Sequence, residues 1–177
     1  MTIFIYIAVS LDNFIATPDG GLDWLYAIPN MEQSDYGFAD FIQRIDALVM
    51  GRKTFETVLS FDPWPYQKPV FVLSRTLTAL PEKALGKAEL IRGEPAEVVR
   101  ILGARGFHNL YVDGGRTIQG FLEADLIDEM IITRIPILLG GGVPLFGSLP
   151  REMKFRLVST EQLNDTLVKS IYRRLRQ

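Results

Sequence analysis

Three short motifs in the chain combine the end of an apolar run with groups that suit a phosphate. They are Gly51-Arg52-Lys53-Thr54, Ser74-Arg75 and Gly114-Gly115-Arg116-Thr117. A strand that turns into a helix at glycine leaves bare backbone N–H groups at the positive end of a helix dipole, which favours an anion. Glycine matters because a side chain would hold the ligand away and because such turns need unusual backbone angles. The motifs therefore predict anion binding. The alternative is that the turns carry no ligand and the cations are ordinary solvated surface charges.

A carboxylate and a hydroxyl are candidates for proton chemistry. Asp35 lies where a helix is expected to begin, so it is either a helix N-cap or a carboxylate that bonds the polar edge of a nitrogen heterocycle. Thr133 interrupts an apolar run, and its hydroxyl either fills the core or orients Asp35 or the substrate. Trp24 and Phe38 are candidates for an aromatic wall against a flat ring, with core packing as the stronger alternative.

Composition excludes several other classes of protein. The chain has 177 residues, 47% of them hydrophobic and 23% charged, which predicts one folded domain over residues 1–177. It has no cysteine and a single histidine, His108, which excludes disulfides, a thiol nucleophile and a metal site of thiolates or several histidines. A net charge of −2 argues against a nucleic-acid partner. No signal peptide or membrane-spanning run is recognised, so we expect a cytoplasmic protein without a membrane partner.

Apolar runs alternate with segments of helical periodicity along most of the chain. The expected strands cover residues 3–9, 14–16, 47–50, 69–73, 89–91, 109–112 and 126–135. The expected helices begin near residues 34–35, 52–55, 95 and 115. This alternation predicts an α/β fold with a mainly parallel sheet and helices on both faces. Residues 155–162 and 166–175 flank Asn164-Asp165 and predict a closing antiparallel hairpin.

In an open α/β sheet, ligands bind outside the carboxyl ends of the strands, so the three motifs should meet at one edge. The two glycine turns suit a pyrophosphate, and Ser74-Arg75 suits a further, isolated phosphate. NADPH has this layout, and arginine favours it over NADH. A Rossmann dehydrogenase that uses NADH would need a G-x-G-x-x-G turn after the first strand, and Val9-Ser10-Leu11-Asp12 does not supply one.

The ordered set of motifs resembles the dihydrofolate reductase-like superfamily, and most closely its branch of riboflavin-biosynthesis reductase domains and their stand-alone relatives. The resemblance rests on residues 8–16, 50–54, 74–75 and 113–116, on Thr133 and on the loop 136–146, and it covers nearly the whole chain. It implies a three-layer α/β/α fold and an NADPH-dependent reductase that acts on a pteridine or a ribosylaminopyrimidine. The alternative is a non-catalytic module of the same fold that binds NADPH or a pterin. The resemblance also implies a homodimer.

The resemblance assigns roles residue by residue. Asp35 and Thr133 fall where classical dihydrofolate reductases keep a substrate-binding acid and the threonine paired with it. The cofactor would be held by Ala8, Ile15 and Ala16 at the nicotinamide, by Gly51, Arg52, Lys53, Thr54, Val112, Asp113, Gly114, Gly115, Arg116, Thr117 and Ile118 around the pyrophosphate, and by Ser74 and Arg75 at the 2′-phosphate.

The chain departs from the family pattern at three points. It has Asp113 before two glycines where classical enzymes have three glycines. The segment between Ala16 and Asp35 differs in length and layout, which leaves the position of Trp24 open. The chain also lacks a zinc-deaminase domain, so another protein would have to deaminate a riboflavin precursor. These departures leave the substrate open.

Overall fold

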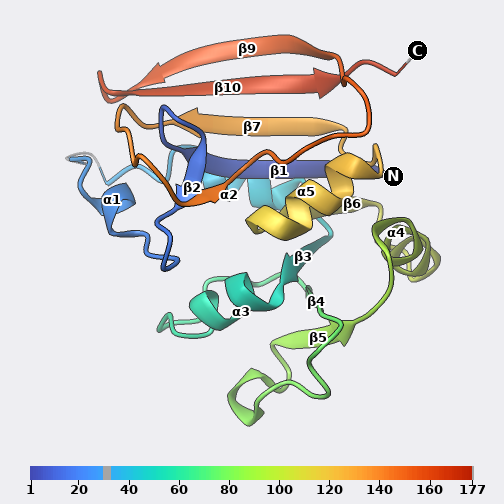
Figure 1. Ribbon diagram of the computed structural model, residues 1–177. Helices are drawn as coiled ribbons and strands as arrows, with labels where there is room; N and C mark the ends of the chain where they lie inside the picture. The colour runs from blue at the N-terminus through green and yellow to red at the C-terminus, as the bar shows by residue number, and fades with distance from the viewer. Residues whose placement is uncertain (30–32, 177) are drawn as a thin grey trace.

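Strands drawn from the whole length of the chain form one eight-stranded sheet in the computed structural model, which describes residues 1–29 and 33–176 (Figure 1). The order across the sheet is β5-β4-β3-β6-β1-β7-β10-β9. The bounds are β1 Thr2–Val9, β3 Ala47–Gly51, β4 Val70–Leu73, β5 Ala88–Ile91, β6 Asn109–Asp113, β7 Glu129–Arg134, β9 Phe155–Leu163 and β10 Leu167–Arg174. The first six strands in this order, β5, β4, β3, β6, β1 and β7, are parallel. Strand β10 pairs antiparallel with β7, and β9 pairs antiparallel with β10 at the edge of the sheet. The predicted α/β fold with a terminal hairpin is confirmed.

Helices cover both faces of this sheet. They are α1 Asp23–Tyr26, α2 Phe38–Gln43, α3 Arg52–Val58, α4 Pro95–Ala104 and α5 Gly115–Glu123, with a 3-10 turn at Glu82–Ala84. Alternate residues of β1 point to opposite faces. Ile3 and Ile5 pack in one buried cluster with residues of α4 and α5, and Phe4 packs in another with residues of α2 and α3. Figure 1 shows α5 in front of β1 and α2 behind the sheet, which gives the three layers.

Two differences from the sequence-based expectations concern strands. The strand expected from residue 126 begins at Glu129, because Leu126 N–H still donates to Phe121 O at the end of α5, and the Asp128 carboxylate accepts from Ile3 N–H. A two-stranded sheet of β2 Phe14–Ala16 and β8 Val143–Pro144 was not expected, because the glycine-rich segment before β8 has no alternating pattern. The second difference matters for the site described below.

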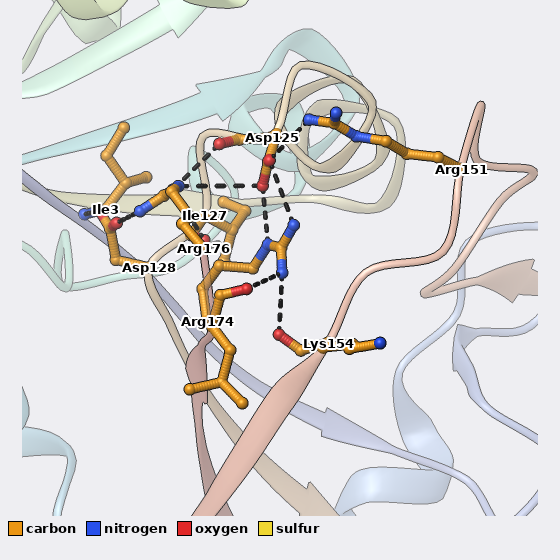
Figure 2. Close-up of polar contacts among 9 residues, drawn as sticks. Ile3, Asp125, Ile127, Asp128, Arg151, Lys154, Arg174 and Arg176 are labelled. Atoms are coloured by element: carbon orange, nitrogen blue, oxygen red, sulfur yellow. Dashed lines mark hydrogen bonds and ion pairs between the residues drawn. The ribbon is translucent and has the colours of Figure 1, made fainter.

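A group of ion pairs ties the end of β10 to the turn between α5 and β7 (Figure 2). Arg174 donates to both carboxylate oxygens of Asp125, at 2.8 and 3.2 Å, and to the Lys154 carbonyl at 2.9 Å. Arg151 pairs with the same carboxylate at 3.0 Å, and Arg176 pairs with Asp128. The hydrogen bond from Arg174 holds the pKa of Asp125 below its usual value. The group fixes the last strand against the parallel part of the sheet.

Replacing Arg174 by methionine is expected to lower the free energy of unfolding at neutral pH by about 2 kcal/mol, the order of a charged hydrogen-bonded pair, because Asp125 loses its best-buried partner but keeps Arg151 and Arg176. The Arg174 side chain is only 8% exposed, whereas that of Arg151 is 69% exposed. Arg151→Met is therefore the matched control, with an expected loss below about 1 kcal/mol. Urea unfolding of both variants measures the difference, and equal losses would contradict the structural role of Arg174. Because the pKa of Asp125 is lowered in the fold, this contribution is present above its unfolded pKa and disappears as the pH falls through the folded value.

Candidate functional site

The two glycine turns lie side by side at the carboxyl edge of the sheet. Strands β3 and β6 are parallel neighbours, with Met50 opposite Asp113, and they lead into α3 and α5. Gly114 has φ 92° and ψ 135°, a conformation that residues with a Cβ rarely adopt, and a Cβ there would overlap Thr54 Oγ1. A Cβ on Gly51 would lie 2.7 Å from Thr117 Oγ1. Each glycine thus faces the threonine of the other turn, and the two helix starts are held together.

The small β2–β8 sheet covers the start of α5. A Cβ on Gly115 would lie 2.8 Å from Val143 Cγ1 and 3.2 Å from Ile15 Cδ1. Ile15 of β2 and Val143 of β8 therefore lie directly against the first residue of α5. Ala16 is buried beside them, and its carbonyl closes against Gly142. The structure brings Ile15 and the second glycine turn together, as the predicted cofactor site requires.

Asp12 fixes the glycine-rich loop that carries β8. Its carboxylate accepts hydrogen bonds from Leu139 N–H at 3.1 Å, Gly140 N–H at 2.8 Å and the Ser10 hydroxyl at 2.6 Å. The Ser10 hydroxyl is the main cause of the lowered pKa of Asp12. Since Ser10 follows β1 directly, this contact connects the central strand to the cover over α5.

The predicted phosphate ligands differ in what their side chains do. Arg52, Lys53 and Arg116 are exposed, whereas Thr117 is buried. Val112 and Ile118 are fully buried in the core shared with α4, so their side chains point away from the turn.

Ser74 is buried, and its hydroxyl accepts from Thr76 N–H at 3.3 Å and Leu77 N–H at 3.1 Å. It therefore shapes the turn that carries Arg75. The Arg75 guanidinium itself is exposed, and it pairs with Glu94 at 2.6 Å.

Asp113 carries a carboxyl group at the end of β6, and the sequence analysis placed it only among the residues around the pyrophosphate. Leu110 and Val112 face the α4–α5 core, so alternation turns Tyr111 and Asp113 toward the layer of α2 and α3. Burial raises the pKa of Asp113 to about 6, although the hydrogen bond from Gly114 N–H, at 2.8 Å, works in the opposite direction. The Asp113 charge contributes to the raised pKa values of Tyr66 and Tyr111, after burial. Such a carboxyl group keeps a proton at mildly acidic pH, as a proton donor must.

Asp35 is exposed and closes the turn before α2. Its carboxylate accepts from Gly37 N–H at 2.9 Å and Ala39 N–H at 2.8 Å, and these bonds lower its pKa. Thr133 is buried on β7, beside Ala8 of β1 and opposite Lys169 of β10. Within residues 1–29 and 33–176, no hydrogen bond joins Thr133 to Asp35. The N-cap of α2 is Gly37, and the helix begins at Phe38 rather than at residues 34–35, so Asp35 closes the preceding turn and is not the N-cap itself. The catalytic role of Asp35 stays a prediction.

The two predicted aromatic residues belong to different clusters. Phe38 packs against Tyr6 with ring centroids 5.5 Å apart and against Tyr111 at 6.5 Å, above the strands that flank the candidate site. Trp24 is buried with Ile135 of the neighbouring loop. Its indole N–H is buried and has no hydrogen-bond partner among the described residues.

Sequence reasoning missed Tyr6, Tyr66 and Tyr111 around the site. The Tyr111 hydroxyl donates to the Tyr6 carbonyl at 2.9 Å, and the Tyr6 hydroxyl donates to the Tyr36 carbonyl at 2.9 Å. The signal for Tyr111 was its alternation with Leu110 and Val112, which places it on the same face as Asp113. No comparable periodicity marks Tyr66, which lies in the loop after α3.

A mostly parallel sheet with interlocked glycine turns at its carboxyl edge and a terminal antiparallel hairpin defines a dihydrofolate reductase-like protein. The family can be named as well: the chain belongs to the RibD C-terminal domain family, whose model matches residues 1–169. In the part of the chain that the structure describes, no helix is long and apolar enough to cross a membrane, and no group of three or more acidic or histidine side chains is placed to hold a metal ion.

Individual proteins that are similar to this chain point to the same family. A solved structure from Shewanella sp. PV-4, assigned provisionally to riboflavin biosynthesis, is 51% identical with a TM-score of 0.96, covering 99% of this chain and 100% of that one. YwjB of Bacillus subtilis strain 168, a protein called uncharacterized, is 37% identical over 92% of each chain. A Thermotoga maritima deaminase and 5-amino-6-(5-phosphoribosylamino)uracil reductase shares the fold, with a TM-score of 0.73, 17% identity, and coverage of 98% of this chain and 56% of that one.

Proposed function

We propose that this protein binds NADPH along the carboxyl edge of its sheet and is a reductase of a pteridine or a ribosylaminopyrimidine. When bound, the cofactor would supply a hydride from its nicotinamide ring. The name of the Thermotoga relative supports the second substrate class, and the resemblance to dihydrofolate reductases supports the first. The family, with its reductase members, supports the reaction type.

The observation that carries the proposal is the pair of interlocked glycine turns. Gly51 and Gly114 have no room for a side chain, because each faces a threonine of the other turn. The backbone N–H groups at the start of α5 are thereby presented next to those of α3, and two such starts suit the two phosphates of a dinucleotide. Ile15 and Val143 against Gly115 would supply an apolar wall next to this site.

In this proposal the chain positions the reactants and supplies a proton. Thr54, Thr117 and the backbone of the two turns would orient the pyrophosphate, and Arg75 would take the 2′-phosphate. Asp113, at the base of the same edge, would hold the proton that a ring or imine nitrogen accepts during reduction. Apolar residues of the β2–β8 sheet would exclude water from the reacting atoms.

The test has two stages. Titration of the purified protein with NADPH, followed by cofactor fluorescence, should show saturable binding. Loss of cofactor absorbance is then measured with a dihydropteridine and with 5-amino-6-(5-phosphoribosylamino)uracil. Oxidation with either one supports the reductase. Binding without oxidation across both substrates would favour the alternative, a non-catalytic NADPH- or pterin-binding module. Absence of NADPH binding would overturn both.

We also propose that the protein is a homodimer that uses the β9 edge. Strand β9 pairs with β10 on one side and with no described strand on the other. Its nine residues include Leu157 and Val158, which are 53% and 42% exposed. A long unpaired strand edge that exposes apolar side chains favours association. Sedimentation equilibrium should show a dimer for the wild type and a monomer for Val158→Lys, and an unchanged dimer in the variant would exclude this edge.

A further inference from the structure

Three charged side chains gather where β4 and β5 end, at the corner of the proposed cofactor site. The two strands are parallel neighbours with Leu73 opposite Ile91. Arg75 lies two residues beyond β4, Arg92 follows β5 directly, and Glu94 precedes α4. The carboxyl ends of β4 and β5 therefore bring two guanidinium groups and one carboxylate to the same edge as the glycine turns.

The turn that carries Arg75 is held in place from two sides. The Ser74 hydroxyl accepts from the N–H groups of Thr76 and Leu77, and Arg92 donates to the Leu77 carbonyl at 2.7 Å. The guanidinium of Arg75 itself makes one ion pair among the described residues, with Glu94 Oε1 at 2.6 Å. Both side chains of this pair are more than two-thirds exposed, so a ligand at this edge can reach either of them.

In dinucleotide sites, an acidic side chain takes the ribose 2′-hydroxyl of the unphosphorylated cofactor, whereas an arginine accommodates the 2′-phosphate of the phosphorylated one. Here the two side chains bind each other. A 2′-phosphate that approaches Arg75 meets the carboxylate of Glu94 at 2.6 Å from Nη2 of the same guanidinium. It must either displace this carboxylate or bind the remaining N–H groups of Arg75 against its negative charge. A 2′-hydroxyl can instead donate to that carboxylate and leave the ion pair in place.

We infer that Glu94 sets the cofactor preference of this protein by competing with the 2′-phosphate for Arg75. This inference rests on the proposed dinucleotide site. It makes the chain a binder of both NADPH and NADH, with a narrow preference for NADPH, and makes Arg92 a positioning residue for the turn under Arg75.

The experiment compares the dissociation constants of NADPH and NADH in the wild type, Glu94→Gln and Arg75→Gln, by cofactor fluorescence. Glu94→Gln should tighten NADPH binding about fivefold, the order expected for an exposed ion pair, and leave NADH binding unchanged or weaker. Arg75→Gln should weaken NADPH binding and leave NADH binding unchanged. Adenosine 2′-phosphate against adenosine 5′-phosphate, used as competitors, should show the same order without the nicotinamide.

Glu97→Gln is the matched control, because it removes the same charge in the first turn of α4. Glu97 has no ion pair with Arg75, whose partner is Glu94. It should change the binding of the two cofactors little and equally. Equal effects of Glu94→Gln and Glu97→Gln on the NADPH-to-NADH ratio would overturn the inference, as would an unchanged ratio in Glu94→Gln. If the wild type binds neither dinucleotide, the proposed function itself fails, which is a different result from an altered ratio.

Discussion

Replacing Gly114 by alanine is expected to weaken NADPH binding at least about a hundredfold and to destabilise the fold. With φ at 92°, an alanine there costs about 1–3 kcal/mol in backbone strain alone. Its Cβ would also overlap Thr54 Oγ1, which lies in the first turn of α3. The two helix starts would have to separate, and a hundredfold loss corresponds to about 2.7 kcal/mol of binding free energy. Fluorescence titration with NADPH and urea unfolding measure the two effects.

Two further variants separate binding from folding. Gly140 also has a positive φ, 71°, and a Cβ at this position would have no neighbouring atom within 4 Å. Gly140→Ala therefore adds positive-φ strain without steric overlap and should keep the NADPH affinity. Gly115 lies in the first turn of α5 without a positive φ, so Gly115→Ala should fold. Its Cβ would meet Val143 and Ile15, so the folded variant should nevertheless bind NADPH more weakly than the wild type. A folded Gly114→Ala protein with the wild-type affinity would contradict the proposed site.

The parallel core of the fold could be predicted because its strands are buried on both faces. Runs such as Leu48, Val49 and Met50 are apolar without alternation, and each is followed by a glycine or a polar residue where the chain leaves the sheet. Since carboxyl ends of parallel strands share one edge, placing the strands also placed the glycine turns together. The location of the candidate cofactor site was thus predictable from local patterns alone.

Features that depend on distant pairs could not be predicted. The ion pair between Arg75 and Glu94 joins residues 19 positions apart, and no sequence pattern connects them. The β2–β8 sheet also pairs distant segments, and the loop before β8 is held by Asp12 at Leu139 and Gly140. The acidity of a carboxyl group depends on burial and on its hydrogen bonds, so sequence reasoning named Asp35 as the acid although the structure gives Asp113 the higher pKa.

Replacing Asp113 by asparagine is expected to lower kcat by about a hundredfold, the low end of the contribution of a positioned acid. Asparagine keeps an oxygen that accepts from Gly114 N–H, so the turn should survive, but the group no longer donates a proton to the substrate nitrogen. In the wild type the rate should fall as the pH rises past about 6, where the carboxyl group loses its proton. The variant should have lost this pH dependence, which steady-state rates across the pH range measure.

Asp35→Asn is the matched control for the same reaction. The pKa of Asp35 is lowered by two backbone hydrogen bonds, so Asp35 is ionised at neutral pH and suits the turn that it closes before α2. We expect Asp35→Asn to change both stability and kcat little, because the asparagine side-chain oxygen accepts the same backbone hydrogen bonds about as well. A large loss of kcat in Asp35→Asn together with normal turnover in Asp113→Asn would assign the acid to Asp35 instead.

The free energy of unfolding tests the role of Asp113 independently, because removing this carboxyl group should slow the reaction but stabilise the fold. Because its pKa in the fold is raised from 3.8 to about 6, the native state binds more protons than the unfolded chain between these values. The wild type should therefore lose stability as the pH rises through this window, and Asp113→Asn should be the more stable protein at about pH 8, by up to about 3 kcal/mol. Below about pH 3 the two should unfold alike in urea, since the carboxyl group is then neutral in both states. A residue whose removal slows the reaction and yet stabilises the fold is kept for chemistry. If Asp113 were purely structural, its substitution would lower the free energy of unfolding at every pH.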